Sequence, residues 1–235
     1  MKHFISISIW ILIASGCPMA TDQLSAAQAN KPLPAVIPIN HDVLVEDQRL
    51  AFVLSDVLHG TGLHGGFVEM TDCSGDLPKG RLQIKQGLTV QQAMDALVAA
   101  NPGYQWELKG GVVNLVPRGG APLLDTRIAK FQMDATGLTM EAVLQDLVRL
   151  PEVREREAAL GLKGGIHAGL GGGGAALERY PVPRQPVPVR FNLEDLSLQE
   201  AFNKIVEASP EGVWIYRETN CNGAKTYIVE MMSGY

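Results

Sequence analysis

Cysteine is the residue type that offers the clearest chemistry in this chain, which contains three of them. Cys17 follows an apolar stretch near the N-terminus, whereas Cys73 and Cys221 lie among polar residues typical of loops. In an oxidising compartment, Cys73 and Cys221 are the pair that would form a disulfide. Two free thiols remain the alternative, because a sequence does not report whether two Cα atoms approach within about 7 Å.

Other residue types give no sign of a catalytic or metal site. The five histidines, which are His3, His41, His59, His64 and His167, share no metal-ligand spacing with a cysteine or an acid. No Gly-x-Ser-x-Gly motif occurs, and the glycine run at 161–174 lacks the Gly-Lys-Ser/Thr of a phosphate-binding loop. We therefore predict no catalytic residue, no metal and no cofactor, and we expect His59 and His64 in solvent. An enzyme of an unrecognised kind is the least favoured alternative.

The N-terminus predicts export. Lys2 and His3 precede an almost unbroken apolar stretch at 4–14, which is shorter than the roughly 20 residues that cross a bilayer as a helix. A positive start followed by such a stretch is typical of a secretory signal peptide. We therefore assign residues 1–29 to a signal peptide and tether, and we expect the protein in the periplasm or at the outer membrane.

The sequence contains two alternative cleavage sites for the signal peptide. The segment Ala14-Ser15-Gly16-Cys17 resembles the bacterial lipobox, in which the cysteine is diacylated and becomes the new N-terminus. Lipidation of Cys17 would then be the only membrane attachment, because no second apolar stretch is long enough to cross a bilayer. The segment Ala27-Gln28-Ala29 is an ordinary small-x-small site, and cleavage there would release a soluble protein.

The charge of the chain argues against nucleic acid as a partner. The formal net charge is −5, and the lysines and arginines are scattered along the sequence. A surface that neutralises phosphates needs clustered basic residues. The partners that we expect are therefore proteins.

The most specific feature of the sequence is an internal repeat. The segment 88–102 matches 196–210 when the chain is shifted by 108 positions. The identical pairs are Leu88 and Leu196, Gln91 and Gln199, Ala93 and Ala201, Val98 and Val206, Ala100 and Ala208, Pro102 and Pro210, and Trp106 and Trp214. This density of matches predicts two related structural units, with Trp106 and Trp214 as equivalent core aromatics.

Both copies begin a helix in the same way. Thr89 and Ser197 are predicted N-caps, and Gln92 and Glu200 follow three residues later to complete a capping box. Apolar residues then recur at helical spacing, and a proline ends each helix. A strand precedes each helix, and an aromatic strand and a returning strand follow it.

The order of elements predicts an α+β fold of two tandem small βαβ-βαββ modules, each with two helices packed on small sheets. The expected boundaries are a linker at 30–40, a first module at 41–117, a linker at 118–126 and a second module at 127–231. The second module contains a Gly/Pro-rich insertion at 151–188, which starts with a short charged helix at 152–160. The middle strand of the second module is not located by its sequence pattern.

The repeated pattern resembles the secretin and TonB short N-terminal (STN) domain. The residues that carry the resemblance are Leu50-Ala51-Phe52-Val53-Leu54, Thr61-Gly62-Leu63, Leu88-Thr89-Val90-Gln91-Gln92-Ala93-Met94-Asp95-Ala96-Leu97, and the aromatic hairpin at 104–116. The resemblance implies protein–protein contact in the periplasm with secretin, pilus or TonB-system components. No β-barrel, plug or ring-forming region follows in this sequence, which departs from the larger proteins of that family.

We therefore expect a non-enzymatic accessory or adaptor protein of an outer-membrane secretin, pilus or TonB-linked system. The alternative is a structural subunit of a secretion or pilus assembly. Strand addition to a sheet edge is the expected mode of contact, with 112–116 and 226–230 as the expected edges.

Overall fold

The computed structural model describes residues 37–135, 140–164, 189–208 and 212–233, all within one compact unit that begins at Pro32. The predicted signal peptide, Cys17, both cleavage sites and most of the Gly/Pro-rich insertion lie outside the described residues. The first half of the chain forms β1 (Val43–Arg49), α1 (Leu50–Leu58), β2 (His64–Asp72), β3 (Lys79–Ile84), α2 (Val90–Ala100), β4 (Tyr104–Lys109) and β5 (Val112–Pro117).

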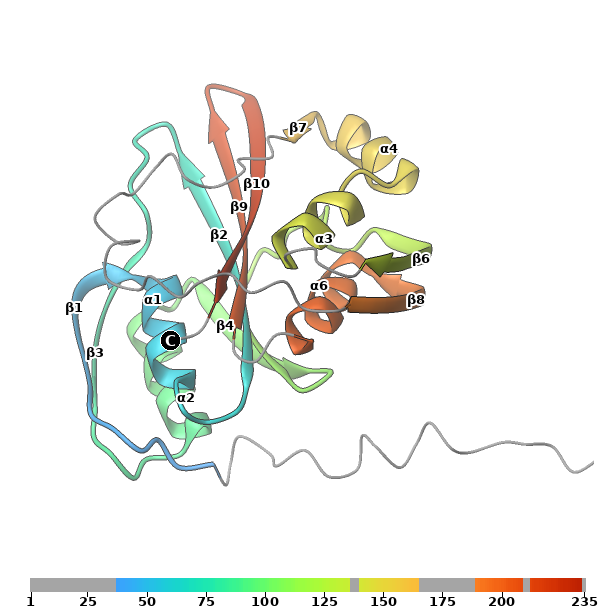
Figure 1. Ribbon diagram of the computed structural model, residues 1–235. Helices are drawn as coiled ribbons and strands as arrows, with labels where there is room; N and C mark the ends of the chain where they lie inside the picture. The colour runs from blue at the N-terminus through green and yellow to red at the C-terminus, as the bar shows by residue number, and fades with distance from the viewer. Residues whose placement is uncertain (1–36, 136–139, 165–188, 209–211, 234–235) are drawn as a thin grey trace, which may run out of the picture. The chain divides into compact units, whose positions relative to one another are not determined.

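The second half forms a similar series of elements (Figure 1). They are β6 (Arg127–Ala135), α3 (Met140–Leu147), α4 (Pro151–Leu160), β7 (Leu162–Gly164), β8 (Val189–Ser197), α6 (Leu198–Glu207), β9 (Gly212–Cys221) and β10 (Ala224–Ser233). The helix α4 is the short charged helix that the sequence predicted, and it starts at Pro151 as expected of a proline in the first helical position.

The two predicted capping boxes are confirmed. The Thr89 side chain accepts a hydrogen bond from the backbone N–H of Gln92, whose side chain accepts from the N–H of Thr89. The same pair of hydrogen bonds joins Ser197 and Glu200 at the start of α6. The boxes satisfy backbone donors that a helix start leaves without partners, so α2 and α6 begin at equivalent positions of the repeat.

The mixed α+β class is confirmed. Six strands form one mixed sheet in the order β4-β5-β2-β9-β10-β7, and β1–β3 and β6–β8 form two separate two-stranded ribbons. The β2–β9 pair joins the two halves of the chain, and it runs parallel from Gly65 opposite Val213 to Asp72 opposite Asn220. The halves therefore share one sheet instead of building a sheet each.

The pairings of the first half recur in the second. In the first half, β2 is parallel to β5, β4 is antiparallel to β5, and β1 is antiparallel to β3. In the second half, β7 is parallel to β10, β9 is antiparallel to β10, and β6 is antiparallel to β8. The short β7 therefore pairs with β10 as β2 pairs with β5.

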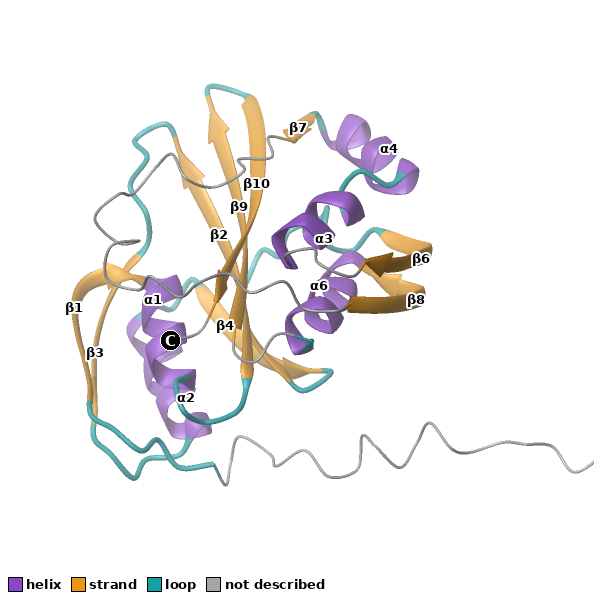
Figure 2. Cartoon of the chain, viewed as in Figure 1, coloured by secondary structure: helices purple, strands orange, loops and turns teal. Residues whose placement is uncertain are grey.

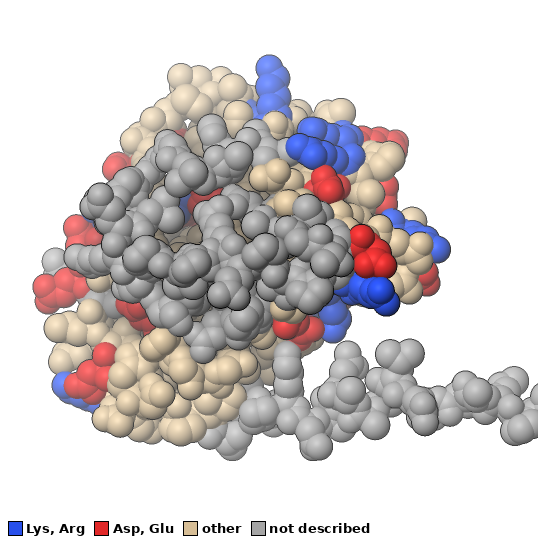
Figure 3. All heavy atoms as spheres, in the orientation of Figure 1, with Lys and Arg blue, Asp and Glu red and all other residues tan. Residues whose placement is uncertain are grey.

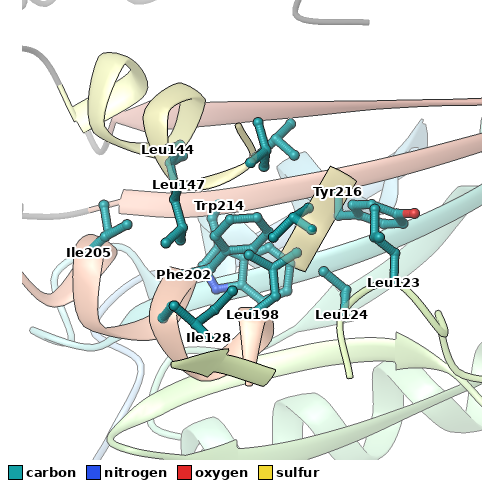
Figure 4. Close-up of a cluster of buried hydrophobic side chains, with 14 of the residues drawn as sticks. Leu123, Leu124, Ile128, Leu144, Leu147, Leu198, Phe202, Ile205, Trp214 and Tyr216 are labelled. Carbon is teal, nitrogen blue, oxygen red and sulfur yellow. The ribbon is translucent and has the colours of Figure 1, made fainter. Parts of the chain in front are cut away.

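Helices cover both faces of the six-stranded sheet (Figures 1 and 2). On one face, α1 and α2 pack between the sheet and the β1–β3 ribbon; on the other, α3 and α6 pack between the sheet and the β6–β8 ribbon. Each core takes side chains from both halves, since Val213 and Ile215 of β9 lie in the first core and Val68 of β2 lies in the second. In the second core, Phe202 of α6 packs beside Trp214 of β9 (Figure 4).

The segment 118–126, which the sequence predicts as a linker, lies against the second core. Leu123 and Leu124 are buried there, and the hydroxyl of the buried Thr126 donates to the backbone oxygen of Leu123. At the other predicted linker, Ile37 and Ile39 are buried in the first core. Both connections therefore contribute to packing.

The expectation that 112–116 is a sheet edge is wrong, and the expectation for 226–230 is wrong in part, because β7 pairs with β10 only at Lys225–Tyr227. The strand β5 lies between β4 and β2, and β10 lies between β9 and β7, so the terminal strands of the sheet are β4 and β7. The physical reason is that the parallel partners of β5 and β10 come from earlier in the chain. A hairpin pattern in the sequence does not reveal such a non-local partner.

Candidate functional site

The junction between the halves carries a disulfide. The parallel register of β2 and β9 ends at Asp72 opposite Asn220, so the next residue of each chain segment is a cysteine. Cys73 and Cys221 are bonded with their Cα atoms 4.6 Å apart, within the range that disulfide geometry requires. The bond closes a sequence separation of 148 residues and ties the two halves together at one end of the shared sheet.

A buried ion cluster lies on the same two strands. Glu69 of β2 is fully buried, and its Oε2 accepts a hydrogen bond from Arg217 Nε of β9 over 2.5 Å. Arg49, the last residue of β1, donates to the same oxygen over 3.2 Å. A buried carboxylate is costly unless it is paired. The cluster therefore ties β1, β2 and β9 together across the junction.

Both arginines of this cluster make a further contact. Arg217 Nη2 lies 3.8 Å from Glu230 Oε2, and the Arg49 guanidinium lies 5.5 Å from the centroid of the Phe52 ring. Within the described residues, Arg49 Nε and Glu69 Oε1 are buried without a hydrogen-bond partner. Two arginines and two glutamates balance in charge, so we interpret the cluster as a structural clamp.

A second buried polar cluster connects α4 to the sheet. The Tyr227 hydroxyl donates to Glu157 Oε1, and Arg154 donates to Glu157 Oε2 over 2.8 Å. The ring of Tyr227 stacks on Tyr216 at 5.5 Å, and the Tyr216 hydroxyl donates to Glu218. Burial raises the pKa of both tyrosines, so both phenols stay protonated and act as hydrogen-bond donors.

The two repeat tryptophans make the same hydrogen bond in the two halves. Trp214 Nε1 donates to Asn203 Oδ1 of α6 over 2.7 Å, and Trp106 Nε1 donates to Asp95 Oδ1 of α2 over 2.9 Å. Trp214 is fully buried, whereas Trp106 is half-buried against the first core. The difference follows from position, because β9 lies inside the sheet and β4 at its end.

The strand β2 carries a glycine where it passes Trp214. A Cβ at Gly66 would overlap the indole of Trp214 and the amide oxygen of Asn114. Gly66 lies opposite Trp214 in the register of β2 and β9. The indole therefore extends over the neighbouring strand, and only glycine leaves space for it there.

The strand β4 has an open outer edge within the described residues. Arg118 N donates to Gly103 O over 2.9 Å, and in an antiparallel ladder such pairs recur at every second residue. Trp106 and Leu108 therefore direct their backbone N–H and C=O groups away from β5. An open strand edge is a template for pairing with another chain, and the Leu108 side chain is 38% exposed.

The two ribbons differ in their surface chemistry. Ion pairs join β6 to β8 at Arg127–Asp195, Lys130–Glu194 and Asp134–Arg190. Charged side chains of this kind protect a strand edge from pairing with other chains. The β1–β3 ribbon has the ion pair Lys79–Asp47, and Leu44 of β1 is 66% exposed there.

The described histidines lie apart from any metal-binding arrangement. His59 is exposed as expected, but the expectation that His64 is solvated is wrong, because β2 lies between β5 and β9 and buries its first residue. His41 Nε2 donates a hydrogen bond to the backbone oxygen of Asp56 over 2.9 Å, and its Nδ1 lies 2.8 Å from Asn40 Oδ1. In the described ranges, no group of three His, Cys, Asp or Glu side chains is arranged to bind a metal ion. His3 and His167 lie outside these ranges.

The surface shows mixed charge. On the face drawn in Figure 3, both basic and acidic side chains occur among the described residues, and several of them lie side by side at the right of the view. Among the helices that the structure describes, none is both long and apolar enough to cross a bilayer. The chain matches no family model, no curated protein and no solved structure.

Proposed function

We propose that this protein is a non-enzymatic interaction module of the bacterial envelope, built from two STN-like modules of the βαβ-βαββ type. The observation that carries the proposal is the recurrence of one set of strand pairings in both halves of the chain. Its role is that of an accessory or adaptor of an outer-membrane secretin, pilus or TonB-linked system.

The motif residues of the resemblance occupy positions that support this proposal. Leu50, Val53 and Leu54 of α1 are buried in the first core. At the end of α1, the Thr61 hydroxyl donates to Leu58 O over 2.6 Å and accepts from Leu63 N over 3.2 Å. This Thr-Gly-Leu turn ends the helix and leads into β2.

The disulfide supports an oxidising compartment. Disulfides persist mainly in exported proteins and are rare where glutathione and thioredoxin keep thiols reduced. The Cys73–Cys221 bond therefore agrees with the signal peptide that the N-terminus predicts. We propose that the mature protein resides in the periplasm, attached by a lipid at Cys17 or released by cleavage after Ala29.

The β1–β3 ribbon is the surface that we assign to envelope partners. Its strand β1 pairs with β3 on one side, and no strand of the described residues pairs with its other side. Leu44 adds an exposed apolar side chain to this edge. Strand addition supplies affinity through backbone hydrogen bonds and specificity through alternate side chains.

The experiment is crosslinking in cells, followed by mass spectrometry of the proteins that the tagged full-length chain captures. Recovery of a secretin, pilus or TonB-system component supports the proposal. Capture of only cytoplasmic proteins contradicts both the export and the assigned role. Fractionation of cells that express Cys17→Ser separates the two forms, because loss of the protein from the membrane fraction requires lipidation at Cys17.

A further inference from the structure

The strand β4 ends the six-stranded sheet on a side where the described residues supply no partner strand. Its register with β5 runs without a break from Tyr104 opposite Pro117 to Lys109 opposite Val112. Proline and β-bulges are common devices that protect a sheet edge from other chains, and β4 contains neither. The edge is therefore regular enough to accept another strand.

We propose that two copies of this chain associate through antiparallel pairing of β4 with β4 of the second copy, about a two-fold axis at Trp106. This inference goes beyond the proposed function, because it uses an edge other than that of β1 and needs no envelope partner. The contact continues the sheet of each copy into the sheet of the other.

The free backbone groups of β4 fit this register. Trp106 and Leu108 direct their N–H and C=O groups away from β5, and the C=O of Tyr104 points the same way because the direction alternates along the strand. The N–H of Tyr104 already donates to Asn101 O over 2.9 Å. In the two-fold register, the two Trp106 residues donate to each other, and each Leu108 N–H donates to the Tyr104 oxygen of the other copy.

The side chains on the α2 face of β4 complement themselves in the same register. Tyr104 and Trp106 pack against the first core on this face, and Leu108 shares the face because side chains alternate along a strand. The two-fold axis places Trp106 opposite Trp106 and Leu108 opposite Tyr104. Aromatic and apolar pairs across neighbouring strands are favourable, so each copy presents the side chains that the other needs.

The opposite face of β4 is polar and is also complementary. Glu107 accepts a hydrogen bond from Gln199 of α6 over 2.8 Å, which places its side chain on the α6 face. Gln105 shares that face by alternation and is exposed. The two-fold register places Gln105 opposite Glu107, so the amide of one copy can donate to the carboxylate of the other.

The neighbouring registers are less favourable. A shift by two residues in one direction places Glu107 opposite Glu107, and like charges directly opposite each other are destabilising. A shift by two residues in the other direction places Leu108 opposite Pro102, which has no backbone N–H to donate. The sequence of β4 therefore selects the register that is centred on Trp106.

A two-fold contact uses the same edge of both copies, so association ends at a dimer. The internal junction of β2 with β9 has a disulfide in addition to its strand pairing, whereas the contact between copies has strand pairing without a covalent bond. One pair of short strands buries little surface compared with stable interfaces. We therefore expect a reversible dimer whose population depends on protein concentration.

The test is disulfide trapping between two singly substituted chains, Gln105→Cys and Glu107→Cys, which carry different tags and are exported in the same cell. Both positions are exposed, so each chain keeps its fold and its own Cys73–Cys221 bond. Residues directly opposite each other at a pair without hydrogen bonds have Cα atoms about 4.5 Å apart, which a disulfide can bridge.

The dimer that contains both tags should be the main disulfide-linked species on a non-reducing gel, and reduction should return it to monomers. Neither variant should form the linked dimer efficiently when it is expressed alone. Dimers of a single variant that match or exceed the mixed dimer overturn the two-fold register. Absence of any linked dimer overturns the contact itself.

Sedimentation gives a second measurement that needs no new cysteine. Leu108→Asp removes the apolar pair with Tyr104 at both symmetric positions and should weaken self-association about tenfold. Leu44→Asp makes the same change at an exposed leucine of β1 and should leave self-association unchanged. Equal association of the two variants contradicts the pairing of β4, as does an unmodified chain that sediments as a monomer at every concentration.

Discussion

Arg217 of β9 donates a hydrogen bond to Glu69 of β2 over 2.5 Å, and this ion pair joins strands that belong to different halves of the chain. Glu69 is fully buried and also accepts from Arg49. The junction between the halves is therefore held by charge in addition to strand pairing and a disulfide.

Replacing Glu69 with glutamine should destabilise the protein by about 3 kcal/mol, because two arginines would lose the carboxylate that compensates their burial. The free energy of unfolding in urea measures the change. Asp47→Asn removes an exposed ion pair with Lys79 and should cost less than about 1 kcal/mol. Equal changes in the free energy of unfolding for the two substitutions would show that the buried cluster stabilises the protein no more than an exposed ion pair.

Removing the disulfide should destabilise the joined sheet more than any single surface change. In the chain-entropy account, a bond that closes a separation of 148 residues stabilises the native state by about 5 kcal/mol. The double variant Cys73→Ser/Cys221→Ser should unfold at lower urea concentration, and a reducing agent should then have no further effect on it. A reducing agent that leaves the unmodified chain unchanged would contradict this role.

Replacing Gly66 with alanine should cost about 3 kcal/mol, since the new methyl group would overlap the indole of Trp214. The free energy of unfolding and the fluorescence of the tryptophans report the change. Gly103→Ala is the matched control, because a Cβ there meets no atom within 4 Å. Equal stability of the two alanine variants would contradict the close approach of Gly66 to Trp214.

Alkaline pH should lower the free energy of unfolding, because it favours ionisation of the stacked tyrosines Tyr216 and Tyr227. Burial raises the pKa of Tyr216 and Tyr227 above the ordinary value of 10.0. A group with a raised pKa in the folded state keeps its full contribution below the unfolded-state pKa and loses it as pH rises. Stability should therefore be constant from pH 8 to about 9.5 and fall above about pH 10. Tyr227→Phe should reduce this fall, as followed by urea unfolding at each pH.

Local patterns in the sequence predicted the local structure well. The capping residues Thr89 and Ser197 begin helices as expected, and Pro151 starts the charged helix α4. These features depend on residues within one or two turns of each other, so a single sequence contains the information.

Local sequence patterns do not predict which distant strands pair. The parallel contact of β2 with β9 connects positions about 150 residues apart, and no local pattern specifies it. This contact is what encloses His64 and places Val213 in the first core. The three-residue β7 was missed because it is too short to show an alternating pattern.

The most direct test of the proposed function uses a photo-crosslinking residue in place of Leu44 in living cells. The control carries the same residue in place of Glu155, which is exposed on α4. We predict that the chain modified at Leu44 is crosslinked to a secretin, pilus or TonB-system component and that the control is not. Equal crosslinking from both positions, or none from Leu44, would contradict the claim that the β1 edge binds an envelope partner.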